Sequence, residues 1–254
     1  MDTRRSSTLL FLCAVVVLLP LRVALADQAE EILAKMAKAV EPGKDMRATF
    51  EMTITSRSNQ QVSWTGEYYR KGDKKRVVFR SPVDIKGVDL AVERMRDGMN
   101  SFKLYLPVIR RLRTIERDVR GEAFFGTDFN YEDLGFEQLS STKQKILGED
   151  DVAGRACYKV ESVPAKGWWY GRIVRYVDKQ DYLPRRTEYF AQNGEAFKQR
   201  TFDRVEPIQS YPTPMEITMR TLPAKTQSRL RFSEVKYDTN FADDLCSISK
   251  EYAE

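Results

Sequence analysis

The sequence has no histidine among its 254 residues and only three cysteines. The absence of histidine excludes Ser-His-Asp and Cys-His catalytic arrangements, histidine-ligated zinc, copper or haem, and histidine pH switches. Phosphate loops of the form G-x-x-x-x-G-K, G-x-G-x-x-G fingerprints and G-x-S-x-G elbows are also missing. Because no nucleophile is paired with a base, we predict a protein that is not an enzyme and has no cofactor.

One acidic stretch, residues 128–133, superficially resembles a calcium loop. It has Asp133 where the sixth position needs glycine, and Leu139 where the twelfth position needs glutamate. We therefore predict no metal site. An enzyme on this chain would need a carboxylate-based or Tyr/Lys-based site, and Asp128 and Tyr131 are the residues whose substitution would test it.

The N-terminus has the three parts of a secretory signal peptide. Two arginines precede an apolar run, Leu9–Leu19, and an A-x-A cleavage site ends at Ala26. The apolar run is short for a membrane span. We expect residues 1–26 to be a cleaved signal peptide and residues 27–254 to form a single exported domain.

The charge balance is modestly basic, with 42 Lys and Arg against 37 Asp and Glu. Nucleic acid is not an expected partner outside the cytoplasm, whereas an anionic membrane surface or an acidic protein fits. Arg110, Arg111, Arg113 and Arg117 form a basic run with two interpretations. It is either a solvated strand edge, where basic residues block unwanted strand pairing, or a docking surface.

Two cysteines, Cys157 and Cys246, remain outside the predicted signal peptide. An oxidising compartment allows a single disulfide between them, which would stabilise the fold by closing a long loop. The alternative is two separate free thiols, one of them buried. The residues alone leave both alternatives open.

One helix is expected near the start of the exported part. Asp27 can cap it, and Pro42 follows its last turn. Its apolar positions recur at helical spacing: Ile32, Leu33, Met36 and Val40.

After this helix the hydrophobic period changes to two. Apolar and polar residues alternate from Met46 to Ile54, as in a half-buried antiparallel strand, and the alternation recurs along most of the chain. Asn193-Gly194 is the strongest hairpin signal, and a type I′ turn there would place Phe190 opposite Phe197. About ten or eleven strands without alternating helices predict a mainly β (α+β) antiparallel meander.

The stretch from Val119 to Leu139 interrupts the strand pattern with aromatic residues among glycines and acids. A short helix is expected over Tyr131–Leu139. Together with the first helix, this segment is predicted to cover one face of the sheet. The covering side chains would be Ile32, Leu33, Met36, Phe124, Phe125, Phe129, Tyr131 and Phe136.

The apolar strand positions are rich in methionine and aromatic residues. Methionine is flexible and polarizable and suits a surface that accommodates variable apolar partners. This face is either an ordinary hydrophobic core or a groove for apolar cargo. Both interpretations apply at once if two short helices leave part of a large sheet uncovered. The predicted lining is Met46, Phe50, Met52, Ile54, Trp64, Tyr68, Phe102, Leu104, Met215, Ile217, Met219 and Phe232.

Several sequence blocks, combined with the export signal and the meander, resemble the outer membrane lipoprotein-sorting protein family, whose members look like the LolA/LolB carriers. The resemblance spans most of residues 27–254. The blocks are Tyr105–Pro107, Arg110–Ile115, Phe125–Phe129, Tyr131–Leu134 and Tyr182–Arg185.

The resemblance implies a half-open β-barrel whose concave face is closed by helices and receives acyl chains. It also implies a periplasmic location and work beside an inner-membrane exporter of the resistance-nodulation-division (RND) type or an outer-membrane acceptor. The Gly126–Leu134 block is distinctive of this family and not of the lipoprotein carriers themselves, so hopanoid-like, sterol-like or other lipids are equally suitable cargo.

We therefore expect a monomeric periplasmic carrier of lipid or lipidated protein, with transient contact to a membrane surface. The alternative is an envelope-stress or regulatory interaction module on the same scaffold, which would sense lipids or outer-membrane proteins.

Overall fold

The computed structural model describes residues 18–137, 142–164 and 168–248 of the chain. In this part, a helix, α1 (Leu18–Val40), precedes one antiparallel sheet of thirteen strands. The strands are β1 (Asp45–Thr55), β2 (Gln61–Lys71), β3 (Lys74–Ser81), β4 (Asp89–Arg94), β5 (Asn100–Leu106), β6 (Arg111–Thr114), β7 (Thr142–Val152), β8 (Arg155–Pro164), β9 (Arg172–Asp178), β10 (Pro184–Phe190), β11 (Ala196–Ile208), β12 (Tyr211–Thr221) and β13 (Thr226–Tyr237).

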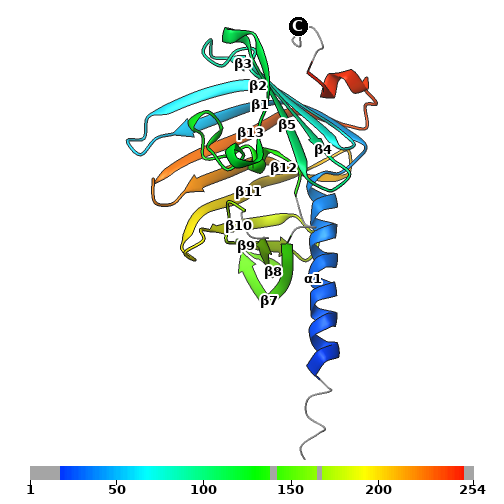
Figure 1. Ribbon diagram of the computed structural model, residues 1–254. Coiled ribbons are helices and arrows are strands. Elements are labelled where there is room, and N and C mark those ends of the chain that lie inside the picture. Colours follow the sequence, from blue (N-terminus) through cyan, green and yellow to red (C-terminus); the bar gives the residue numbers. More distant parts are fainter. Residues whose placement is uncertain (1–17, 138–141, 165–167, 249–254) are drawn as a thin grey trace, which may run out of the picture.

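The strand order places the two ends of the meander in the middle of the sheet. The order is β6-β5-β4-β3-β2-β1-β13-β12-β11-β10-β9-β8-β7, so the first strand pairs with the last. The strands β6 and β7 are consecutive in the chain but form opposite edges. The connection between them must therefore cross the sheet, and Figure 1 shows the sheet curving around it.

This architecture confirms the predicted fold class: a mainly β, curved and unclosed antiparallel sheet. The strand number is higher than predicted, partly because β6 is a strand of four residues. Its sequence, Arg111–Thr114, has one apolar side chain, so its alternation is too short to read as a strand. The basic run predicted for this region is the outer edge of the sheet.

The helix α1 begins earlier than predicted. It starts at Leu18 and passes through Asp27, so Asp27 does not cap it in the uncut chain. The residues before Asp27 are mostly leucine, alanine and arginine, which favour helix, and Pro20 falls in the first turn where proline is tolerated. The predicted end before Pro42 is confirmed, because α1 ends at Val40.

The helix α1 covers only one end of the sheet. Its buried side chains Leu33 and Met36 pack against Val160 of β8 and Val177 of β9. Ile32 belongs to the same cluster. Ile32, Leu33 and Met36 thus cover the β8–β9 end of the sheet and lie outside the clusters that contain Met46 and Phe50, because periodicity shows which face of an element is apolar and not which element packs on it.

The short helix expected over Tyr131–Leu139 is replaced by a single 3₁₀ turn, Glu132–Leu134, where the chain is described. The backbone N–H of Asn130 donates to Asp133 Oδ2, and the N–H of Asp133 donates to Asn130 Oδ1, at 2.9 and 2.7 Å. Gly135 then continues in an extended conformation and ends the turn. Residues 138 and 139 of the predicted helix lie outside the described residues.

The hairpin at Asn193-Gly194 forms, but with a different turn. Only Gly194 of the pair has a positive φ, +87°, and its N–H donates to the carbonyl of Ala191. The loop is thus three residues long with glycine in the left-handed position, one residue longer than a type I′ loop. The register shifts accordingly: Phe190 pairs with Ala196, so the predicted Phe190–Phe197 pair is wrong.

Both cysteines are buried free thiols. Cys157 packs beside Val174 and Tyr176 in the β8–β9 region, and Cys246 lies in the 3₁₀ turn Asp243–Cys246. Of the two alternatives, the structure has the separate free thiols and not a disulfide.

Two features are absent from the described residues. Helices in that part of the chain are too short or too polar to cross a membrane. Within the same residues, no group of three or more histidine, cysteine, aspartate or glutamate side chains could hold a metal ion.

Candidate functional site

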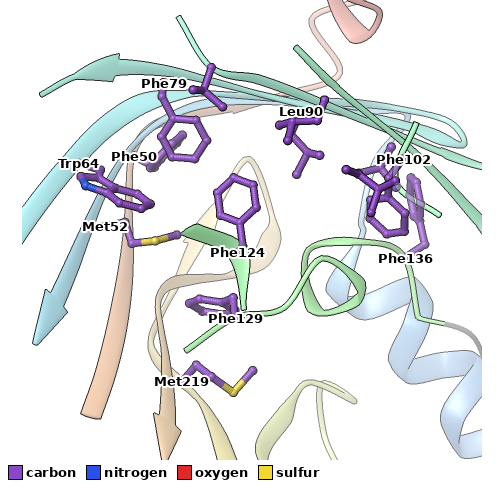
Figure 2. Close-up of a cluster of buried hydrophobic side chains, with 14 of the residues drawn as sticks. Phe50, Met52, Trp64, Phe79, Leu90, Phe102, Phe124, Phe129, Phe136 and Met219 are labelled. Carbon is purple, nitrogen blue, oxygen red and sulfur yellow. The ribbon is translucent and has the colours of Figure 1, made fainter. Parts of the chain in front are cut away.

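The connection from β6 to β7 fills the concave face with aromatic side chains. We call residues 115–137 the central segment. Its Phe124 stacks against Phe79 of β3 with ring centroids 5.7 Å apart. Figure 2 shows Phe124 in the middle of the buried cluster, Phe129 nearer Met219, and Phe136 beside Phe102. The segment is therefore part of the core.

A cavity lies between the central segment and the middle strands of the sheet. It has about 1090 Å³ of space, including its mouth. Six of the twelve predicted lining residues border it, and they come from β1, β2, β12 and β13. These residues are Met46, Phe50, Met52, Tyr68, Ile217 and Phe232.

The other six predicted lining residues do not border this cavity. Trp64, Phe102, Leu104 and Met219 are buried in the core cluster around Phe124, and Ile54 packs against that cluster. Met215 belongs to a separate cluster with Met46 and Tyr237. The alternation correctly identified an apolar face, but most of that face is core.

Sequence reasoning missed several cavity residues. Val77, Phe79, Phe202, Leu230 and Tyr237 also line the cavity. Leu230 pairs with both Met52 and Ile217, so these three form a continuous apolar row across β1, β13 and β12. Leu230 alternates with Phe232, a predicted lining residue, along the last strand. This alternation was the sequence signal that could have identified Leu230 as a lining residue.

The predicted covering residues of the central segment divide into two groups. Phe124, Phe129 and Phe136 are buried, and Phe129 borders the cavity. The ring of Tyr131 packs edge-on against Phe124 at 5.4 Å. Phe125 is exposed instead, because its backbone takes a left-handed conformation with φ of +46° that turns its side chain away from the core.

A buried carboxylate fixes the central segment to the sheet. Thr226 and Ser228 of β13 donate hydrogen bonds to the two carboxylate oxygens of Asp128, at 2.5 and 2.8 Å. The Asp128 backbone N–H donates to Ser228 Oγ in turn. Burial also raises the pKa of the Tyr131 phenol. Asp128 and Tyr131, the residues considered for an enzyme, thus make structural contacts.

A second set of contacts holds the end of the segment through charge. The carboxylate of Glu137 accepts from Arg175 Nη2 of β9 at 2.8 Å and from Arg200 Nη2 of β11 at 2.7 Å. Burial alone would raise the pKa of Glu137, but the two guanidinium groups overcome this effect and lower it to about 2. Asp133 accepts from Tyr170 Oη at 2.7 Å and pairs with Lys198 at 3.3 Å.

These arginines border a second, smaller cavity of about 490 Å³. Its walls include Trp168, Tyr170 and Tyr189. Sequence reasoning missed this charged site. The signal was Arg175 at an inward position between Ile173 and Val177, where alternation calls for an apolar residue.

Three solved structures of similar fold cover nearly the whole described chain. A DUF1329 family protein from Desulfovibrio piger has a TM-score of 0.82 and 22% identity, and the match covers 88% of this chain and 97% of that one. A putative outer membrane lipoprotein-sorting protein domain from Vibrio parahaemolyticus has the same TM-score and identity, with 87% and 97% covered. A LolA superfamily protein from Nitrosomonas europaea has a TM-score of 0.70 at 14% identity, with 87% and 97% covered.

The sequence comparison assigns the family. A family model described as that of an uncharacterized protein matches residues 71–249, which is more than half of the chain. The chain belongs to this family and has the LolA-like fold. No curated protein matches the chain. The family match and the similar solved structures confirm the resemblance drawn from the sequence blocks.

The predicted basic residues lie at one edge of the LolA-like sheet. Arg110, Arg111, Arg113 and Arg117 are all exposed. Arg111 and Arg113 belong to the edge strand β6, and Arg110 follows the 3₁₀ turn Pro107–Ile109. Three of these arginines thus lie on or beside a solvated strand edge, and Arg117 lies in the 3₁₀ turn Arg117–Val119 that follows it.

Proposed function

We propose that the protein is a periplasmic carrier that binds a lipid, the acyl chains of a lipoprotein or another apolar cargo on the concave face and passes it between envelope components. The observation that supports the proposal is the mostly apolar cavity between the central segment and the middle of the sheet. Its apolar row Met52, Leu230 and Ile217 offers an acyl chain a continuous contact surface. Each buried methylene would contribute about 0.8 kcal/mol.

Loading and release would require the central segment to move. The segment is tied to the sheet by separate polar contacts: Asp128 to Ser228, Asp133 to Tyr170 and Lys198, and Glu137 to the two arginines. Because Phe124 is buried in the middle of the core cluster, a movement of the whole segment would open the core. The part that borders the cavity, from Phe129 to Glu137, is the part suited to act as its cover.

Transfer also needs contact with a membrane or a membrane protein. The turn Pro107–Ile109 carries exposed Val108 and leads into the basic edge strand. An inner-membrane RND-type exporter or an outer-membrane acceptor would dock there, with the arginines contacting acidic groups. The absence of histidine and of phosphate loops fits a carrier better than an enzyme.

The test is to purify the full chain from the periplasm of its host and identify co-purified material by native mass spectrometry and organic extraction. We expect a stoichiometric lipid or other apolar molecule, displaceable by a neutral apolar fluorescent dye. If the protein carries no such material and the dye does not bind, the carrier proposal is wrong. A stable complex with a signalling protein in the same preparation would favour the regulatory alternative.

A further inference from the structure

Three buried polar side chains form one row across β9, β10 and β11. Arg175 pairs with Thr187, and Thr187 pairs with Arg200, so the three lie side by side on the same face of the sheet. Their exposed fractions are 4%, 0% and 8%. Arginine is almost never buried this deeply unless it is paired. Both arginines are paired with one carboxylate, that of Glu137, and Arg175 Nη1 also donates to Ser162 Oγ at 2.8 Å.

Each member of the row has a polar atom without a hydrogen-bond partner in the described structure. These atoms are Nε of Arg175, Oγ1 of Thr187 and Nε of Arg200. Buried polar atoms are nearly always bonded, because desolvating them without a partner is costly. The three atoms lie on strand positions that are in register. Two of them are guanidinium N–H donors and one is a hydroxyl, so together they form a set of hydrogen-bond donors for one acceptor.

The charges in the row do not balance. The two guanidinium groups share the single carboxylate of Glu137. The neighbouring pair of Lys198 and Asp133 is neutral by itself. Within these groups one positive charge is in excess, and the further acid that lines the smaller cavity, Glu132, accepts a hydrogen bond from Asn100 instead.

The two arginines of the row line the cavities, and Thr187 lies between them without lining either cavity. Arg175 and Arg200 line the smaller cavity of about 490 Å³. Gly135, Glu137, Asp133 and Arg200 line both this cavity and the larger apolar one. A charged cavity, lined by the two arginines and by Glu132, Asp133 and Glu137, thus adjoins an apolar one.

We infer that Arg175 and Arg200 bind the anionic headgroup, a carboxylate or a phosphate, of an amphiphile whose acyl chain lies in the larger cavity. The inference rests on the proposed function and narrows its cargo to anionic amphiphiles. Glu137 is the internal anion that the headgroup replaces.

The first test compares ligands of equal chain length on the full chain. Palmitate and palmitoyl-lysophosphatidylglycerol supply the carboxylate and the phosphate, and monopalmitoylglycerol supplies a neutral headgroup, each displacing a neutral apolar dye. At least one anionic ligand is expected to bind about tenfold or more tightly than the neutral one, as charge-assisted hydrogen bonds allow. The anionic ligand that binds with the higher affinity identifies the headgroup class. Arg200→Gln should remove most of this preference.

A second variant covers the case in which Arg200→Gln fails to fold. Glu137→Gln removes the internal competitor, so affinity for the anionic ligand should rise severalfold while affinity for the neutral ligand stays unchanged. A purely structural ion pair predicts no gain for either ligand. Glu161→Gln is the matched control, because Glu161 pairs with Arg172 and does not line either cavity.

The outcomes separate this inference from the proposed function. Binding of dye and neutral ligand with no preference for either anion, and no gain in Glu137→Gln, overturns the headgroup site and leaves the carrier in place. Binding of none of the probes overturns both.

Discussion

Phe50 lies over Gly66, its cross-strand partner on β2. A Cβ added at Gly66 would lie 2.5 Å from Phe50 Cζ and 2.4 Å from the carbonyl oxygen of Val78. The missing side chain makes room for the Phe50 ring, which packs edge-on against Phe79 at 5.5 Å and borders the larger cavity. The shape of the cavity therefore depends on a glycine inside a strand.

Gly66→Ala should destabilise the protein despite the better strand propensity of alanine. The methyl group meets backbone as well as the ring, so relaxation is restricted, and overpacking of this kind costs about 1–3 kcal/mol in the free energy of unfolding. Urea denaturation measures it. Val62→Ala on the same strand, at an exposed position, should change stability by less than about 0.5 kcal/mol. Equal effects of the two variants would contradict the packing argument.

Ile217→Asp should abolish binding of a neutral apolar dye while the protein stays folded. Ile217 lines the cavity and is only partly buried, so a carboxylate there is hydrated in the empty protein but must be desolvated when an apolar ligand binds. We expect a loss of affinity of about tenfold or more, measured by dye titration, with circular dichroism as the check on folding. Leu222→Asp, at an exposed position just after β12, is the matched control and should bind the dye normally.

The sequence predicted the elements of this fold better than their arrangement. Alternation such as that from Met46 to Ile54 depends only on which face is buried, so it reveals strands directly. It does not reveal that β1 pairs with β13, because that pairing joins residues nearly two hundred positions apart. The position of α1 was missed for the same reason.

The candidate site was only partly predictable. Phe50 and Ile217 were found because cavity walls and core share one apolar pattern, and the same fact made Leu104, a core residue, look like lining. Arg175 and Arg200 were missed because arginine in a strand ordinarily faces solvent. Only the tertiary position of Glu137 shows why these two face inward.

Ser228→Ala should loosen the central segment without unfolding the sheet. Ser228 donates to the buried Asp128 carboxylate at 2.8 Å, and hydrogen bonds to charged groups contribute about 1.5–3 kcal/mol. Hydrogen exchange of amides in residues 124–134 should therefore quicken, while the amides of β12 and β13 keep their protection. Ser233→Ala on the exposed face of the same strand is the control, and it should leave both regions unchanged. Faster exchange throughout the sheet would show that Asp128 supports the whole fold.

Glu132 should make stability fall with rising pH. Burial raises its pKa from 4.5 to about 7, although Asn100 Nδ2 donates to its carboxylate at 2.7 Å. The folded protein then binds this proton more tightly than the unfolded chain does. The resulting stabilisation is complete below about pH 4.5 and is lost as pH rises to about 7.

Glu132→Gln removes this dependence. Urea denaturation at pH 5 and pH 7.5 should show a smaller decrease in the free energy of unfolding for Glu132→Gln than for the unmodified chain. Glu116→Gln, at an exposed position, should behave like the unmodified chain. If all three proteins show the same decrease, Glu132 is not the titrating group.

Two loops with exposed valines lie beside the basic edge. Val83 is 82% exposed and Val108 is 88% exposed. Their loops adjoin, because a Cβ at Gly87 would lie 3.4 Å from Pro107 Cγ. Exposed aliphatic side chains beside Arg110 and Arg111 suit a surface that is both apolar and anionic, as a bilayer with acidic lipids is.

Co-sedimentation with vesicles tests this contact. The protein should pellet with vesicles containing phosphatidylglycerol, less with pure phosphatidylcholine, and less again as salt screens the arginines. Val108→Asp combined with Arg110→Glu should remove most of the binding, because it replaces an inserting side chain and reverses a charge at the same tip. Val62→Asp, an equally polar change at another exposed valine, should bind as the unmodified chain does. If the double variant still binds vesicles and Val62→Asp does not, the membrane contact lies elsewhere on the sheet.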